Sequence, residues 1–264
     1  MKFCANLSLL FTEVDLLKRF DAAREEGFTA VEIQFPYEAE LSELVNAQQA
    51  NELSIALINV PTDDLMSGGE GLACVKNKRD KFKQAVDQCL AYAEALQVDC
   101  VNILPGRSLE EKNRQYYRDT LMENLDYAAD QLASINVLAT FEAINTEDMP
   151  GFLIHSTQQM RDLLADINHR NLAMQYDIYH MAKMNEPVAE QLQQLLHSDK
   201  ICDRIGHLQF ADTPQRGEPA SGELDFNALF SLIEQSPYQG WLGAEYKPTQ
   251  STAASLQWFS PYKD

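Results

Sequence analysis

An eightfold alternation of short apolar segments with longer amphipathic ones is the feature that most constrains the fold of this chain. The short segments are rich in Ile, Leu and Val, and they predict β-strands at 2–7, 30–35, 54–60, 100–104, 138–145, 172–177, 205–211 and 240–246. The first helix is expected to begin near Thr12 and to end at Gly27, and the others cover 41–51, 76–96, 109–133, 157–167, 187–197, 225–235 and 249–259. Eight strand–helix units in 264 residues predict an α/β protein, a single (β/α)8 TIM barrel with one domain over residues 1–264.

The composition narrows the classes of function. Forty acidic residues against 21 basic ones give a net charge of -19, so the surface should repel nucleic acid and anionic membranes. The five cysteines form no CxxC pair, which favours a reducing compartment. No segment resembles a signal peptide or a membrane span. We therefore expect a cytoplasmic protein without nucleic-acid or membrane partners, and the sequence leaves open whether it forms a homo-oligomer.

Glu142 is an acid near the end of an otherwise apolar predicted strand. Period-two alternation places it on one strand face with Thr140 and Ile144. A carboxylate that leaves water must be paired, hydrogen-bonded or bound to a metal, because an isolated buried charge is too unfavourable. This segment alone is equally compatible with a structural salt bridge and with a functional site.

Polar residues also end the next three predicted strands. Asp177, Gln209 and Glu245 follow Glu142 at intervals of 35, 32 and 36 residues, each about one strand–helix unit. In a (β/α)8 barrel these strand ends meet at the face that carries the active site. Each residue alone is compatible with a helix cap or a salt bridge, but three converging acids would repel one another without a cation. Oxygen ligands suit Mg²⁺ or Mn²⁺ better than zinc, so we predict a magnesium or manganese site.

Several segments of the chain resemble one enzyme family. The resemblance is to the hydroxypyruvate isomerase family, which includes 2-oxo-tetronate isomerases and belongs to the xylose-isomerase-like barrels. It covers nearly the whole chain, and its specific part is the second half. The segments that carry it are 141–145 (FEAIN), 176–180 (YDIYH), 206–212 (GHLQFAD), 216–219 (RGEP), 222–223 (GE) and 240–248 (GWLGAEYKP), with 5–8 (ANLS) and 35–37 (FPY) in the first half.

The resemblance implies a set of site residues. It implies that Glu142 and Glu245 form the proton-transfer pair. It also implies a divalent metal held by Glu142, Asp177, Gln209 and Glu245. Related ketose 3-epimerases carry histidine at the third ligand position, and the glutamine here disfavours that branch.

Four further residues are candidates for substrate binding. By resemblance, His180 and Arg216 contact the substrate, and the guanidinium group matches a carboxylate bidentately. Lys247 follows Glu245 by two residues, so strand alternation places it on the same face. It is either a further positive charge for the substrate or a surface lysine. Glu147, in the loop after the fifth strand, either reaches the substrate or is an exposed loop acid.

The expected function is isomerisation of a small oxo-acid substrate through an enediolate, most closely hydroxypyruvate to tartronate semialdehyde or 2-oxo-tetronate to 3-oxo-tetronate. The competing interpretations are a ketose 3-epimerase or sugar isomerase acting on neutral sugars, an abasic-site endonuclease and a non-catalytic binding barrel. The endonuclease needs a basic DNA-binding face and a histidine-rich zinc cluster, and the net charge of -19 with five histidines disfavours it. Two other polar residues are interpreted structurally, Glu32 as part of a salt bridge at the barrel floor and His207 as a hydrogen-bonded core histidine.

Overall fold

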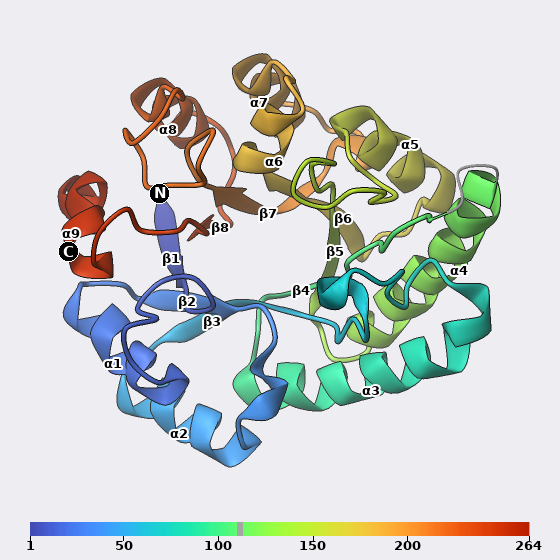
Figure 1. The fold of residues 1–264 in the computed structure, drawn as a ribbon, viewed down its shortest axis with the longest axis horizontal. Helices are drawn as coiled ribbons and strands as arrows, with labels where there is room; N and C mark the ends of the chain where they lie inside the picture. The colour runs from blue at the N-terminus through green and yellow to red at the C-terminus, as the bar shows by residue number, and fades with distance from the viewer. Residues whose placement is uncertain (110–112, 264) are drawn as a thin grey trace.

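The computed structural model describes residues 1–109 and 113–263, and its centre is a closed barrel of eight parallel strands in the order β1 to β8 (Figure 1). This confirms the predicted TIM barrel. The apolar interior strands pair with their sequence neighbours, and β8 closes the ring on β1. The strands are β1 (Lys2–Asn6), β2 (Ala30–Ile33), β3 (Ser54–Asn59), β4 (Cys100–Asn102), β5 (Leu138–Glu142), β6 (Leu172–Asp177), β7 (Ile205–Phe210) and β8 (Trp241–Ala244).

Helices surround the strands and bury their apolar stripes against them (Figure 1). Within the described residues none of them is long and apolar enough to cross a membrane. The α-helices are α1 (Leu16–Glu25), α2 (Leu41–Ala50), α3 (Arg79–Leu96), α4 (Arg114–Ala133), α5 (Thr157–Ile167), α6 (Ile178–Lys183), α7 (Val188–Leu196), α8 (Phe226–Glu234) and α9 (Thr252–Ser255), the last followed by a 3-10 helix at Leu256–Tyr262.

Two helix predictions were inaccurate, and both errors have a local cause. The first helix begins at Leu16 rather than near Thr12, because Asp15 has an extended backbone (φ -62°, ψ 150°) and is the N-cap of the helix. The short helix α6 was not predicted at all. It starts directly after β6, where Oδ1 of Asp177 caps it by accepting a hydrogen bond of 2.8 Å from the backbone of Tyr179. The predicted start of the fourth helix at 109 adjoins residues 110–112, which lie outside the described residues.

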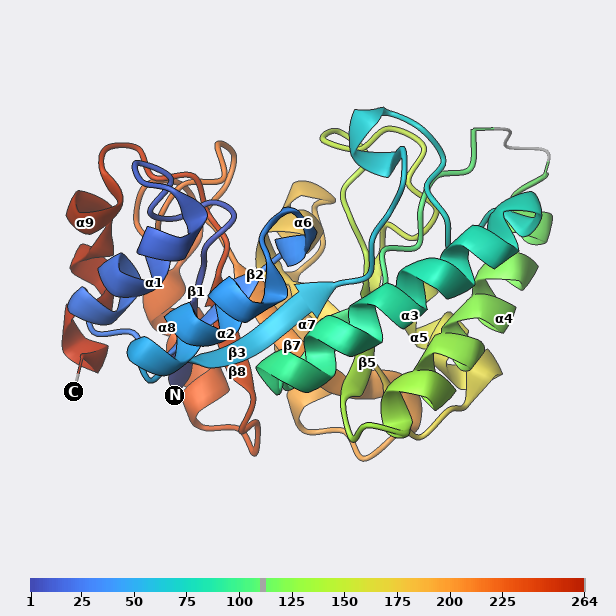
Figure 2. The same ribbon diagram turned by 90° about the horizontal axis from the view of Figure 1, so that it is seen from below.

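The carboxyl ends of the strands meet at one end of the barrel. Figure 2 shows the loops that follow β3 and β5 rising together there, and their apolar residues pack with Leu104 from the loop after β4. In the strand register Asp177 pairs with Gln209, whereas Glu142 pairs with Gln175, two residues before Asp177. The site residues are therefore offset in register between β5 and β6. Such an offset is expected for residues at similar height, because the strands of a closed barrel are staggered.

Candidate active site

A cavity of about 180 Å³ opens at the carboxyl end of the barrel. Glu142, Glu245, His180 and Arg216 line it together with apolar residues. The structure thus brings four of the candidate residues to one space, although they come from β5, the segment after β8, α6 and the loop after β7. Asp177 and Gln209 do not line this cavity, and both are buried beside it.

Glu142 is held by two amide side chains. Asn102 donates to Oε1 at 2.8 Å, and Gln175 donates to Oε2 at 3.1 Å. Burial raises the pKa of Glu142 well above its ordinary value, and the charges of Glu245 and Asp177 raise it further. Three acids so close together favour either a bound proton or a cation at this place.

The two carboxylate oxygens of Asp177 have different surroundings. Oδ1 caps α6, whereas Oδ2 is buried and has no hydrogen-bond partner among the described residues. The nearest cationic or imidazole groups to Oδ2 are His180 Nε2 at 3.5 Å and Arg216 Nη2 at 3.9 Å. Ligand atoms of Glu142, Asp177 and His180 all lie within 4.8 Å of one another. An unpartnered carboxylate oxygen beside a second carboxylate is a donor set that fits a divalent cation.

Glu245 and Arg216 form an ion pair in the cavity wall. Arg216 Nη2 donates to Oε2 of Glu245 at 2.8 Å, and Gln34 donates to the other oxygen. Burial raises the pKa of Glu245 to about 7, although the charge of Arg216 opposes that rise. Burial would lower the pKa of Arg216, but the charges of Glu245 and Asp177 keep it above its ordinary value, so the guanidinium stays positive. Arg216 also lies over the ring of Tyr179, 5.0 Å from its centroid.

The loop after β7 fixes the position of Arg216. Asp212 is buried there and accepts hydrogen bonds from the backbone N–H groups of Gly222 at 2.8 Å and Leu224 at 3.0 Å. The carbonyl of Arg216 accepts a hydrogen bond of 2.7 Å from the backbone of Lys247. Arg216 itself has a left-handed backbone (φ 61°), which this network holds in place.

His180 is a neutral hydrogen-bond donor to the site. Asn145 Oδ1 accepts from the backbone N–H groups of Glu147 and Asp148, which turns its Nδ2 toward His180 Nδ1 at 2.7 Å. Nδ1 is therefore the acceptor, and the proton resides on Nε2, which faces Asp177. Burial lowers the pKa of His180 well below its ordinary value, and the charge of Arg216 lowers it further.

Gln209 belongs to a polar network in the barrel interior. Its Nε2 donates to Glu32 Oε1 at 2.8 Å, and its Oε1 accepts from Gln175. Glu32 is fully buried, and its other oxygen lies 2.7 Å from Nε2 of His207. The structural interpretations of Glu32 and His207 are thus confirmed. This network orients the amide of Gln209 with its oxygen toward Gln175, which also contacts Glu142.

Two candidate substrate ligands lie away from the cavity. Glu147 is exposed and forms an ion pair with Lys183. Lys247 is exposed as well, and neither residue lines the cavity. β8 ends at Ala244, so the strand alternation that aligned Lys247 with Glu245 does not extend that far.

Sequence reasoning missed the amide side chains that support the acids. Asn102, Gln175 and Gln34 each donate to a glutamate of the site. A usable signal was present, because Gln175 precedes Asp177 by two residues on the same strand face and Asn102 is the last residue of its strand. An isolated amide is nevertheless far less conspicuous in a sequence than a buried acid.

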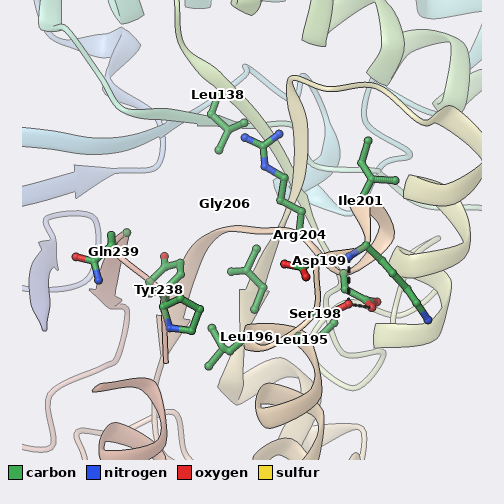
Figure 3. A pocket seen from close by; sticks show the side chains of 15 residues that line it. Leu138, Leu195, Leu196, Ser198, Asp199, Ile201, Arg204, Gly206, Tyr238 and Gln239 are labelled. Carbon is green, nitrogen blue, oxygen red and sulfur yellow. Dashed lines mark hydrogen bonds between the residues drawn. The ribbon is translucent and has the colours of Figure 1, made fainter. Parts of the chain in front are cut away.

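A second cavity, of about 400 Å³, lies at the opposite end of the barrel (Figure 3). Its wall includes Leu138, Ile205 and Gly240, which stand at the start of β5, β7 and β8. None of the four acids and amides of the predicted metal site lines it. Active sites of (β/α)8 barrels lie at the carboxyl ends of the strands, so the smaller cavity is the candidate active site.

Comparisons with known proteins identify the family of the chain. The family model described as Xylose isomerase-like TIM barrel matches residues 20–262. Hydroxypyruvate isomerase of Escherichia coli (strain K12) is 41% identical over 263 residues, which cover 100% of both chains. The 2-oxo-tetronate isomerase of Cupriavidus necator is 36% identical over 261 residues, which cover 99% of this chain and 98% of that protein.

Solved structures share the fold of this chain. A crystal structure described as AP endonuclease, family 2 from Brucella melitensis superimposes with a TM-score of 0.94 at 35% identity, and the match covers 100% of this chain and 99% of that one. D-psicose 3-epimerase from Clostridium cellulolyticum H10 superimposes with a TM-score of 0.79 at 15% identity, covers 100% and 99% of the two chains, and shares the fold. The chain therefore belongs to the xylose isomerase-like TIM barrel family and, within it, to the group that contains hydroxypyruvate isomerase and the 2-oxo-tetronate isomerases.

Proposed function

We propose that this protein is a metal-dependent isomerase of a small 2-oxo acid, hydroxypyruvate or 2-oxo-tetronate, and that it acts through an enediolate. The names of its relatives support an isomerase of this substrate class. The single observation that carries the proposal is the meeting of two buried glutamates, Glu142 and Glu245, with the half-buried cation Arg216 in one cavity. Two carboxyl groups can move a proton between adjacent carbons, and a guanidinium can hold the substrate carboxylate.

Glu142 and Glu245 are proposed to transfer the proton. One carboxylate removes a proton from the carbon beside the substrate carbonyl, and the electron pair of that C–H bond forms the enediolate double bond. A proton is then delivered to the former carbonyl carbon, and the neighbouring hydroxyl gives its proton to the former carbonyl oxygen as it becomes the new carbonyl. For hydroxypyruvate this sequence gives tartronate semialdehyde with no change in composition.

Arg216 and His180 are proposed to orient the substrate. Arg216 is fixed by its hydrogen bond to Glu245, so it would hold the substrate carboxylate next to one of the proton-transfer groups. His180 offers a neutral N–H donor at Nε2, which lies 3.5 Å from Asp177 Oδ2 and is suited to a substrate oxygen that gains negative charge. Lys247 and Glu147, which are exposed, would act on an incoming substrate at the entrance rather than in the cavity.

The metal is proposed to lie among Glu142, Asp177, Gln209 and Glu245. The unpartnered Oδ2 of Asp177 supports this placement. A bound Mg²⁺ or Mn²⁺ would supply Lewis-acid stabilisation of the negative charge that develops during proton removal.

The proposal is tested with Glu142→Gln and Glu245→Gln, using Glu123→Gln as the control. Each site variant should lose about a hundredfold to ten-thousandfold in turnover of both 2-oxo acids, since general acid–base catalysis contributes about 10² to 10⁴. Glu123 is an exposed acid paired with Arg79 on the outer helices, and its variant should keep wild-type turnover. Product formation is followed by NMR and folding by circular dichroism. Wild-type turnover by either site variant would contradict the proton-transfer assignment.

Metal dependence is tested separately. Activity should disappear after exhaustive chelation and return on addition of Mn²⁺ or Mg²⁺, and direct binding is measured by calorimetry with the metal alone. Asp177→Asn should weaken that binding, because it replaces the unpartnered carboxylate oxygen with a neutral amide. Full activity in a preparation shown to be metal-free would refute the proposed cofactor.

The same assays separate the competing functions. A ketose 3-epimerase would prefer neutral ketohexoses, whereas Arg216 favours a carboxylate substrate, so acids should be converted and ketohexoses should not. An abasic-site endonuclease would cleave abasic DNA, which the net charge of -19 disfavours.

A further inference from the structure

The cavity has two chemically different sides. The side described above carries Glu142, Glu245, His180 and Arg216. The remaining wall is largely apolar and is built by Phe35, Met66, Leu104, Ile144 and Met149. Asn59, the last residue of β3, also lines the cavity and is only 4% exposed. An amide beside an apolar wall needs a hydrogen-bonding partner, because burying an unpaired polar group is unfavourable.

The side chain of Asn59 lacks such a partner. Its backbone is fixed, since its N–H donates to Gln34 at 2.9 Å and its carbonyl accepts from the hydroxyl of Tyr37. Its side-chain oxygen, however, is buried with no hydrogen-bond partner among the described residues. Asn102, which pairs with Asn59 in the β3–β4 register, has an unpartnered side-chain oxygen too. Because Asn59 lines the cavity, its unpaired acceptor marks a place where a ligand hydroxyl binds, whereas Asn102 is not part of the cavity wall.

Asn59 lies where the end of the substrate opposite its carboxylate would reach. Three strands lie between β3 and β7 on either side of the closed ring of eight, so the two face each other across the barrel. Arg216 follows β7, and Glu142 ends β5, between the two. A substrate whose carboxylate lies at Arg216 and whose reacting carbons lie near Glu142 therefore extends toward Asn59. A hydroxyl group both donates and accepts, so it matches either edge of an amide.

From this geometry we infer that Asn59 binds the terminal hydroxyl of a four-carbon 2-oxo acid and thereby makes the enzyme prefer this acid to hydroxypyruvate. The inference rests on the proposed function and adds the length of the substrate to it. Hydroxypyruvate has no carbon beyond its reacting pair, so it leaves the amide unpaired. 2-oxo-tetronate carries one further hydroxymethyl group, which crosses the apolar wall and ends at Asn59. Asn59 is thus a specificity-determining residue and takes no part in proton transfer.

The test compares Asn59→Leu with the wild type on both acids. Leucine has a similar size but cannot form hydrogen bonds, so kcat/KM for 2-oxo-tetronate should fall about tenfold, the value of one hydrogen bond of about 1.4 kcal/mol. The value for hydroxypyruvate should stay within about twofold by the same reasoning. Asn46→Leu, at an exposed position on α2, is the control for a general effect of the substitution. Equal losses on both acids, or no loss on either, would overturn the inference.

A binding measurement keeps this test independent of turnover. Erythronate and glycerate are unreactive acids that differ by one hydroxymethylene unit, and calorimetry gives their affinities directly. The wild type should bind erythronate more tightly, and Asn59→Leu should remove the difference. If the wild type isomerises neither 2-oxo acid but shows this pattern, the proposed function fails and the role of Asn59 stands. Equal binding of the two acids by the wild type would refute that role.

Discussion

The buried carboxylate of Glu32 gives the sharpest prediction about stability. Its Oε1 accepts hydrogen bonds from Asn6 and Gln209, both at 2.8 Å, and its Oε2 lies 2.7 Å from His207 and 3.5 Å from the thiol of Cys4. All of these groups come from β1, β2 and β7, and Glu32 is 0% exposed. Four surrounding donors satisfy an ionised carboxylate completely. Because the group is buried, a donor that a substitution leaves unpaired cannot form a hydrogen bond with water instead.

Glu32→Gln should lower the free energy of unfolding by about 4 kcal/mol. The substitution turns one acceptor oxygen into an NH₂ donor, which leaves two buried donors unpaired at about 1–3 kcal/mol each. Since a domain of ordinary stability has about 5–15 kcal/mol, the variant should still fold in dilute buffer.

Urea denaturation measures this loss. The midpoint should fall while the slope of unfolding free energy against urea stays unchanged, because the same surface is exposed on unfolding. The matched control is Glu123→Gln, which breaks the exposed ion pair with Arg79 and should change stability by less than about 1 kcal/mol. A loss for Glu32→Gln no larger than that of the control would refute the claim that the interior network stabilises the barrel.

Two further predictions concern the loops around the site. Gly222→Ala would place a Cβ atom 1.9 Å from the carbonyl oxygen of Thr213, so the loop that carries Arg216 must shift. The value of kcat/KM for a 2-oxo acid should fall about tenfold to a hundredfold, which is the effect of losing a hydrogen bond to a charged group. Unchanged kinetics would argue against this role of the loop. Hydrogen bonds from Thr252 lower the pKa of Glu13 in the folded protein, despite the opposing effect of burial. The unfolded chain therefore binds a proton at Glu13 more tightly than the folded protein does. The contribution of Glu13 to folding stability is lost as the pH falls below about 4.5. Glu13→Gln should therefore reduce the fall in melting temperature between pH 6 and pH 3, and an unaltered pH dependence would contradict this assignment.

The barrel was predictable because its signal is periodic and repeated. Eight apolar segments at regular spacing leave little choice of architecture. The predicted end of the sixth strand at Asp177 matches the observed one, whereas the fifth strand ends at Glu142, three residues before its predicted end. The helix α6 was not predictable in this way, since six residues contain too few turns for an apolar stripe. Its start depends on a single cap, which a sequence does not distinguish from an acid of the site.

Contacts across the barrel were harder to predict than positions along it. Alternation indicated that Glu32 and His207 point inward, but their pairing joins residues 175 positions apart. This pairing depends on how the barrel closes, and so does the lack of a partner for the side-chain oxygen of Asn59. For Lys247 the alternation was extended beyond the end of β8 at Ala244, where the pleat that justifies it has stopped.

The capping of α6 by Asp177 joins local folding to chemistry in one side chain. One oxygen shapes the backbone that carries His180, and the other remains available to the site. Asparagine would still cap the helix but would remove the charge, whereas glutamate would keep the charge on a longer arm that no longer matches the cap. Aspartate alone fulfils both roles, so this position can vary less than it could if it had only one of them. A newly evolved activity on this barrel would have to preserve the aspartate or rebuild the turn after β6.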